Sequence, residues 1–61
     1  MKWSEMKRLA MQYGWYKYRS GAKHDIYRHP DKKEQIQLER HSSQEVRPGL
    51  MKKLLKTITE N

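Results

Sequence analysis

His24 is the residue of this 61-residue chain best suited to acid–base chemistry, because an imidazole titrates near neutral pH. It follows a glycine-containing turn, opens a probable strand, and has the cations Arg19, Lys23 and Arg28 close by in sequence. Cleavage of RNA needs a base for the 2′-hydroxyl proton, an acid for the departing 5′-oxygen and cations around the phosphorus. A positioned imidazole contributes about 10²–10⁴-fold to such proton transfers. These residues therefore suit work on a phosphodiester, although spacing alone leaves open a turn histidine with no role.

The other two histidines have less favourable positions. His29 precedes a proline and is typical of a turn residue. His41 lies in a polar loop with Ser42 and Ser43, where it could bind phosphate or assist His24. The three histidines are five and twelve residues apart, which is not a compact ligand motif. We therefore predict neither a metal site nor another cofactor.

The charge of the chain favours an anionic partner. Fourteen Lys and Arg stand against seven Asp and Glu, for a net charge of +7. Such a field attracts nucleic acid first, an acidic protein second and an anionic membrane surface third. The remaining alternative is that the lysines only keep a small protein soluble. The chain has no cysteine, no signal-peptide pattern and no apolar run near the roughly 20 residues of a membrane span, so we expect a soluble cytoplasmic protein.

Two helices are expected to frame the chain. Residues 4–13 carry an apolar stripe at helical spacing, with Ser4 as the N-cap and Gly14 as the closing residue. A second stripe follows Pro48, which suits the first turn of a helix over residues 48–59. The stripes consist of Met6, Leu9, Ala10 and Tyr13 in the first helix and Leu50, Met51, Leu54, Leu55 and Ile58 in the second.

Between the helices, three short segments have the character of strands. Residues 15–19 are aromatic-rich, residues 24–29 follow a turn, and residues 35–39 alternate between apolar and polar side chains. Their short connections predict a three-stranded antiparallel meander. Both helices are expected to cover one face of it, giving a single α+β domain over residues 1–61 in the order α-β-β-β-α, the layout of double-stranded-RNA-binding domains.

Strand parity predicts which side chains share a face. The uncovered face is expected to carry one of two sets from residues 15–19, either Trp15 with the residues of its parity or Tyr16 and Tyr18. Asp25, Tyr27 and His29 are expected on the same face. Parity groups His24 with Ile26 and Arg28, and a strand-end position predicts His24 at the rim of the helix-covered face. Sheet packing is the favoured role of the tyrosines, although exposed aromatics among cations are what single-stranded RNA stacks upon.

The ordered set of these motifs resembles the HicA (YcfA-like) toxins of bacterial and archaeal toxin–antitoxin modules. The matching segments are Ser4-Glu5, Gly14-Trp15, Arg19 to Pro30, His41, Glu45 to Leu50, and Leu54-Leu55-Lys56. The segment from His24 to Asp31 is the most specific, being similar to the family's histidine, apolar strand and His-Pro-Asp turn. The sequence departs from the usual pattern at Gly21-Ala22-Lys23 and at Lys32, which replaces a glycine.

This resemblance implies a small ribonuclease that cleaves messenger RNA without a metal, with His24 at the position of the catalytic histidine. It also implies a HicB-type antitoxin that covers the active surface and makes the operator DNA contacts itself. The alternative is a non-catalytic basic module that binds RNA through charge. A third possibility is an interaction subunit neutralised by an acidic partner.

Overall fold

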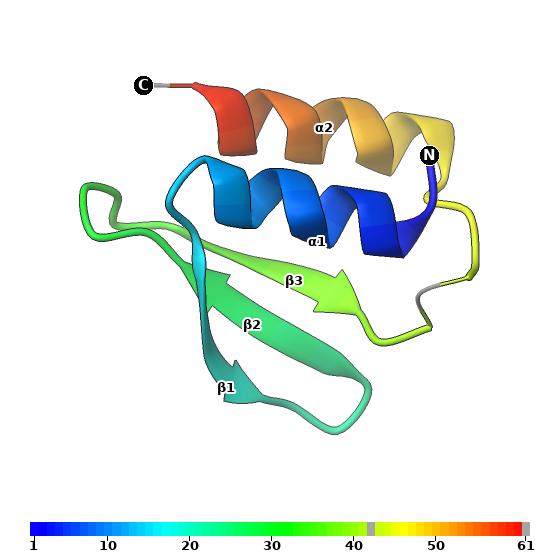
Figure 1. Cartoon of the computed structure of the whole chain (residues 1–61), viewed down its shortest axis with the longest axis horizontal. Helices are drawn as coiled ribbons and strands as arrows, with labels where there is room; N and C mark the ends of the chain where they lie inside the picture. Colours follow the sequence, from blue (N-terminus) through cyan, green and yellow to red (C-terminus); the bar gives the residue numbers. More distant parts are fainter. Residues whose placement is uncertain (42, 61) are drawn as a thin grey trace.

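The computed structural model describes residues 1–41 and 43–60, so Ser42 of the predicted phosphate-binding loop lies outside the described residues, as does Asn61. The described residues form α1 (Trp3–Gln12), β1 (Tyr16–Ser20), β2 (His24–Arg28), β3 (Gln35–Glu39) and α2 (Pro48–Thr59). The strands form one antiparallel sheet in the order β1-β2-β3, and both helices lie on the same side of it (Figure 1). The predicted α+β fold and its α-β-β-β-α order are confirmed.

Helix α1 begins earlier than the sequence indicated. The N-cap is Lys2, so the prediction of Ser4 in this role is wrong. Lys2 pairs with Glu45 in an isolated antiparallel bridge, which holds the backbone extended at the residue where the helix starts. The Glu5 carboxylate then accepts a hydrogen bond of 2.8 Å from the Lys2 backbone N–H. A contact distant in sequence therefore overrides the local preference of serine for the cap.

The end of α1 follows the prediction. Gly14 has a φ of +92°, a conformation that glycine adopts without strain. The Gly14 N–H donates to Met11 O at 3.2 Å and the Trp15 N–H donates to Ala10 O at 3.0 Å, which together close the helix. Tyr13 does not complete the apolar stripe, since it is 44% exposed. The turn at Gly14 directs Trp15 into the core.

The core lies between the helices and one face of the sheet. Its buried apolar members are Trp3, Met6, Ala10, Trp15, Tyr27, Ile36, Leu38, Val46, Leu54 and Ile58. Leu50, Met51 and Leu55 of the second predicted stripe pack against this cluster from α2. Removal of this apolar surface from water is the main stabilising contribution available to so short a chain.

The strand register corrects the predicted assignment of sheet faces. Tyr27 lies opposite Ile36, and Asp25 lies opposite Leu38. Residues opposite each other in an antiparallel pair share a face, so Asp25 and Tyr27 lie on the helix-covered face rather than the uncovered one. The aliphatic Ile26 therefore points the other way. The prediction that Ile26 faces the helices, with Asp25 and Tyr27 on the uncovered face, is wrong. The Tyr27 ring supplies the apolar surface that Ile26 was expected to give.

The register consequently groups His24 with the uncovered side of the sheet, although at the strand end it still lines a groove with Trp3 of α1 and Leu50 of α2. We call this uncovered side of the sheet the open face; its side chains are Tyr16, Tyr18, Arg19, His24, Ile26, Arg28, Gln35, Gln37 and Glu39. Of the two sets considered for this face, the Tyr16 and Tyr18 set occupies it, while Trp15 is 2% exposed in the core. His29, which was also expected there, lies one residue beyond the end of β2.

Candidate active site

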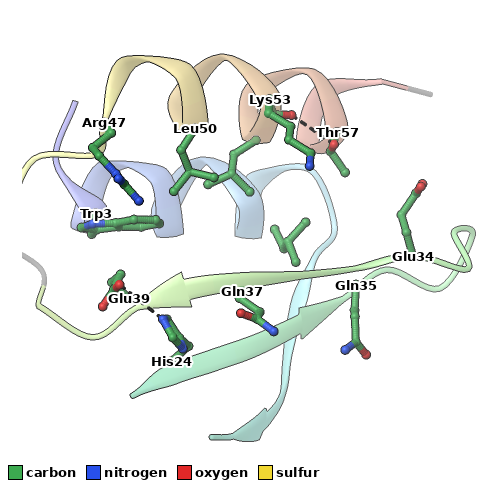
Figure 2. Close-up of a pocket in the computed structure, with 12 residues that line it drawn as sticks. Trp3, His24, Glu34, Gln35, Gln37, Glu39, Arg47, Leu50, Lys53 and Thr57 are labelled. Carbon is green, nitrogen blue, oxygen red and sulfur yellow. Dashed lines mark hydrogen bonds and ion pairs between the residues drawn. The ribbon is translucent and has the colours of Figure 1, made fainter. Parts of the chain in front are cut away.

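His24 and Glu39 form a cross-strand pair on the open face. They are opposite each other in the β2–β3 register, His24 as the first residue of β2 and Glu39 as the last residue of β3. His24 Nε2 lies 3.3 Å from Glu39 Oε1, and the side chains are 41% and 33% exposed (Figure 2). Among residues 1–41 and 43–60, this is the one polar contact of the His24 ring. The imidazole is therefore oriented by a carboxylate and still reachable from solvent.

Further polar side chains gather around Glu39. It lines a hollow of about 420 Å³ together with Lys23, Arg40 and His41. The hollow lies beside the β1–β2 turn and the start of the loop that follows β3. The structure thus brings Lys23 and His41, both predicted as phosphate contacts, close to the carboxylate that contacts His24. Three cationic or titratable groups around one hollow can bind an anion.

A groove of about 430 Å³ runs from the same pair along the free edge of β3. His24 and Glu39 line one end of it, and the α2 side is lined by Lys53 and Thr57 (Figure 2). Arg47, the N-cap of α2, lines the groove as well. Figure 2 shows the Lys53 and Arg47 side chains reaching from the helical layer toward the sheet edge. A polyanion in contact with His24 therefore has cations on more than one side.

The two predicted arginines lie farther along the open face. Arg19 is opposite Ile26, and Arg28 is opposite Tyr16 at the far end of β2. The Arg28 guanidinium carbon lies 5.0 Å from the centroid of the Tyr18 ring. The predicted phosphate contacts thus do not form one cluster. Lys23 and His41 lie at the His24 end, whereas Arg28 lies with the tyrosines.

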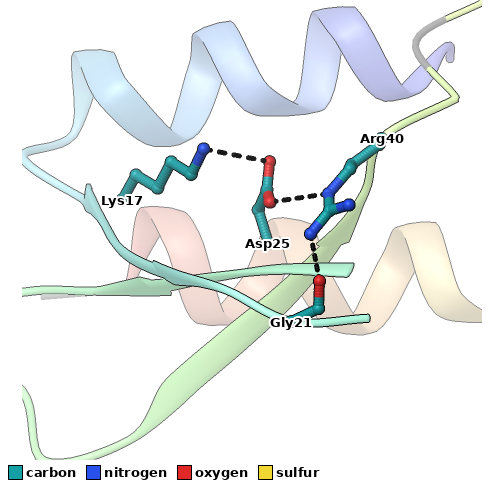
Figure 3. Close-up of polar contacts among 4 residues, drawn as sticks. All are labelled: Lys17, Gly21, Asp25 and Arg40. Atoms are coloured by element: carbon teal, nitrogen blue, oxygen red, sulfur yellow. Dashed lines mark hydrogen bonds and ion pairs between the residues drawn. The ribbon is translucent and has the colours of Figure 1, made fainter. Parts of the chain in front are cut away.

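A buried carboxylate holds the turn that precedes His24. Asp25 is 5% exposed on the covered face, where its Oδ1 accepts a hydrogen bond of 3.0 Å from Arg40 Nε (Figure 3). Arg40 Nη2 donates in turn to the carbonyl of Gly21. Lys17 Nζ lies 3.8 Å from the other Asp25 oxygen. The hydrogen bond from Arg40 lowers the pKa of Asp25, and its attraction to Lys17 adds to this effect against the opposing effect of burial.

This network fixes the backbone on which His24 is carried. Within the turn, the Gly21 N–H donates to His24 O at 2.7 Å, while Arg40 binds the Gly21 carbonyl. A side chain at Gly21 would meet the His24 carbonyl oxygen at 2.8 Å. The β1–β2 turn is therefore tied to the residue after β3, and His24 starts from a restrained position.

His29 belongs to the scaffold and not to the site. The Asp31 N–H donates to His29 Nδ1 at 3.0 Å, so the ring proton is on Nε2, which donates to Tyr13 O at 2.9 Å. Trp15 meets the ring edge-on at a centroid distance of 5.5 Å. A Cβ at Gly14 would lie 2.9 Å from His29 Nε2. The ring thus joins the end of α1 to the turn after β2, in agreement with the predicted turn role.

No group of three or more His, Asp or Glu side chains within the described part of the chain is arranged to hold a metal ion. Neither helix described is long and apolar enough to cross a membrane.

Sequence reasoning missed Glu39 and Arg40. Glu39 was recognised only as a polar residue pointing away from Ile36 and Leu38. The short β2–β3 connection did contain a signal, because a meander with strands of equal length sets the first residue of β2 opposite the last residue of β3. No comparable signal existed for Arg40, whose role depends on Asp25 being on the covered face.

Comparison with known proteins places the chain in a family. The family model described as HicA toxin of bacterial toxin-antitoxin matches residues 3–59, nearly the whole chain. No curated protein and no solved structure matches it.

Proposed function

Because this chain belongs to the HicA toxin family of bacterial toxin–antitoxin systems, we propose that it is an endoribonuclease that cleaves messenger RNA without a metal ion. The observation that carries the proposal is the His24 imidazole, half exposed on the open face with its Nε2 3.3 Å from the Glu39 carboxylate. Cations line the hollows beside this pair. The geometry supports acid–base chemistry on a phosphodiester.

The nearness of Glu39 Oε1 to Nε2 supports Nδ1 as the nitrogen of His24 that acts as the base. An ionised carboxylate only accepts hydrogen bonds, so it favours the neutral tautomer with the proton on Nε2. Nδ1 then carries the lone pair that takes the proton of the ribose 2′-hydroxyl. As the imidazole becomes positively charged, the Glu39 carboxylate stabilises it. Glu39 thus has the role of a positioning residue.

The cations and His41 serve the remaining parts of the reaction. The 2′-oxygen attacks phosphorus, the bond to the 5′-oxygen breaks, and the 5′-oxygen leaves as a hydroxyl after gaining a proton. We assign this proton to His41, which lines the hollow beside Glu39 with Lys23. Lys23 and Arg19 stabilise the negative charge on the phosphate during the attack.

Membership of the family implies an antitoxin partner. We propose that this partner is of the HicB type, covers the open face and masks His24, and that it supplies the operator DNA contacts of the complex. The net charge of +7 supports an acidic surface on that partner. Masking predicts that binding protects His24 from chemical modification, while unchanged reactivity would contradict it.

Cleavage of RNA by purified protein in EDTA tests the catalytic proposal. Wild type is expected to cleave, and His24→Ala is expected to lower the rate by about 10²–10⁴-fold. Lys52→Ala, which removes an exposed cation of α2, is the matched control and should retain the wild-type rate. Equal cleavage by wild type and His24→Ala, or none by wild type, would overturn the proposal.

A non-catalytic RNA-binding module is the second candidate function, because the open face carries exposed tyrosines beside arginines. This alternative predicts steeply salt-dependent RNA affinity with no cleavage. It also predicts that expression of His24→Ala arrests growth as effectively as wild type, whereas the nuclease proposal predicts that the toxicity is lost.

A further inference from the structure

The end of the open face distant from His24 carries exposed aromatic rings next to a guanidinium. Tyr16 and Tyr18 are 47% and 53% exposed, although both belong to a strand. The Arg28 guanidinium lies over the Tyr18 ring, 5.0 Å from its centroid. The third strand tyrosine, Tyr27, is 4% exposed in the core, so packing accounts for that ring and not for the other two.

A β-bulge concentrates these groups on one side of the sheet. The β1–β2 register shifts between Lys17 and Arg19, which leaves Tyr18 as the additional residue. Strict alternation would turn Arg19 toward the helices, because Tyr18 already faces away from them. With the bulge, Arg19 lies opposite Ile26 and shares the open face with Tyr18. The irregularity thus places a second cation beside the exposed rings.

We propose that Tyr18 and Arg28 form a stacking subsite for one unpaired base of a single-stranded RNA. A tyrosine face stacks with any base, and a neighbouring arginine contributes both stacking and attraction to the backbone phosphate. The net charge of +7 favours a polyanion over an apolar or cationic partner on this surface. The subsite therefore selects for unpaired bases and tolerates different sequences.

The position of the subsite relative to His24 rests on the proposed nuclease function. His24 and Arg28 are four positions apart along β2, a span of roughly 13 Å at about 3.3 Å per residue. That distance exceeds one nucleotide, so the stacked base is a neighbour of the cleaved phosphodiester and not part of it. The polar Gln37 lies on β3 between the two positions, opposite Ile26. A duplex cannot present such a base without unpairing it.

Binding measured without cleavage tests the subsite. The probe is a short single-stranded RNA carrying the fluorescent base 2-aminopurine, titrated into His24→Ala protein. Adding Tyr18→Ala is expected to weaken binding by about 5- to 150-fold, the range for loss of one stacked base. Tyr18→Phe should keep the affinity, because it keeps the ring. Tyr13→Ala is the matched control, since Tyr13 is 44% exposed at the end of α1.

Further arms separate this proposal from its alternatives. With an abasic nucleotide at the stacked position, Tyr18→Ala and its parent should bind equally. If the protein with Tyr18→Ala and its parent bound the intact RNA equally, the subsite proposal would be overturned. It would also be overturned if Tyr18→Ala weakened binding of the antitoxin and left RNA binding unchanged. The RNA affinity is measured on proteins that lack the His24 imidazole. A failed cleavage assay would therefore refute the proposed nuclease function, and the affinity measurement would still test the stacking subsite.

Discussion

The two ends of strand β2 carry histidines with different surroundings, His24 as its first residue and His29 just after its last. At its start, the His24 ring has a single polar contact among the described residues, with the carboxylate of Glu39, and faces solvent. One residue beyond its end, the His29 ring has both nitrogens engaged by backbone groups and packs against Trp15. An imidazole whose two nitrogens are occupied cannot exchange protons with a substrate. The histidine that we propose to be reactive is therefore the one that contributes less to the structure.

The supports of the two ends differ in the same way. The His24 end is held by charges, through Asp25, Arg40 and Lys17, on the covered face directly behind the site. At the other end, the His29 ring itself is held by hydrogen bonds to backbone groups and by aromatic packing. The ion pairs of Asp25, which restrain the turn, thus lie on the other face of the sheet from the His24–Glu39 pair that is proposed to perform the chemistry.

The largest effect on stability should come from His29→Ala. It removes the partners of Tyr13 O and the Asp31 N–H, each worth about 1 kcal/mol, and the contact with Trp15, worth about another. We expect the free energy of unfolding to fall by about 3 kcal/mol in urea denaturation. Cleavage per folded molecule should be unchanged.

His24→Ala is the matched histidine change for this measurement. Because its ring is 41% exposed and makes one polar contact, we expect the free energy of unfolding to change by no more than about 0.5 kcal/mol. If both variants lost similar stability, or if His29→Ala abolished cleavage while folded, the division of roles between the two histidines would be wrong.

Arg40→Met should have the next largest effect on the free energy of unfolding, and it acts at the His24 end of β2. It removes the hydrogen bond to Asp25, a buried carboxylate, and the bond to the Gly21 carbonyl. Loss of one partner of a fully buried pair costs about 3–5 kcal/mol. Because Arg40 is 44% exposed and its charge is screened by water, we expect about 2 kcal/mol at neutral pH.

The pH dependence of that loss identifies its cause. Arg40 lowers the pKa of Asp25 in the folded protein, so the ionised carboxylate stabilises the fold above its unfolded pKa of about 3.9. This stabilisation is lost as the pH falls through the folded pKa. The difference between wild type and Arg40→Met should therefore narrow below about pH 4 in denaturation series. A difference that stays constant through this range would assign the loss to packing of the arginine stem instead.

The two helices and β3 illustrate what sequence periodicity could predict. The bounds of α2 and β3 are as predicted, because their apolar patterns are regular and Pro48 marks a helix start. The α1 start was wrong because Lys2 pairs with Glu45, 43 positions later in the chain. Local patterns do not contain such a contact.

The face of the sheet on which β2 residues lie could not be predicted from β2 itself. Ile26, the one aliphatic of this strand, was expected to mark the core. Tyr27 and the ion-paired Asp25 occupy the covered face instead, because their partners on β3 are Ile36 and Leu38. A hydrophobicity pattern does not predict burial of a charged residue whose counterion, Arg40, comes from another segment. The sequence neighbours of His24 were enough to propose a catalytic role for it, but its contact with Glu39 could be known only from the strand register.

Lys32→Met, a change near the His29 end of β2, is expected to lower the free energy of unfolding less than His29→Ala or Arg40→Met. Lys32 Nζ donates to Thr57 O at 2.9 Å and to Glu60 O, so its charge lies at the C-terminus of α2, where the helix carbonyls lack partners. It also lies 5.8 Å from the centroid of the Trp15 ring. These contacts give the lysine at this turn a structural role. Methionine keeps an apolar side chain of similar length without the charge.

We expect Lys32→Met to lower the free energy of unfolding by about 1 kcal/mol, because two carbonyls and the helix terminus lose a cation. The difference should shrink as salt is added, since screening weakens the interaction of the charge with the helix end. Lys33→Met, an exposed neighbour, is the control and should have no measurable effect. An equal loss in both variants would show that this end responds to net charge alone, so that Lys32 has no specific bond to α2.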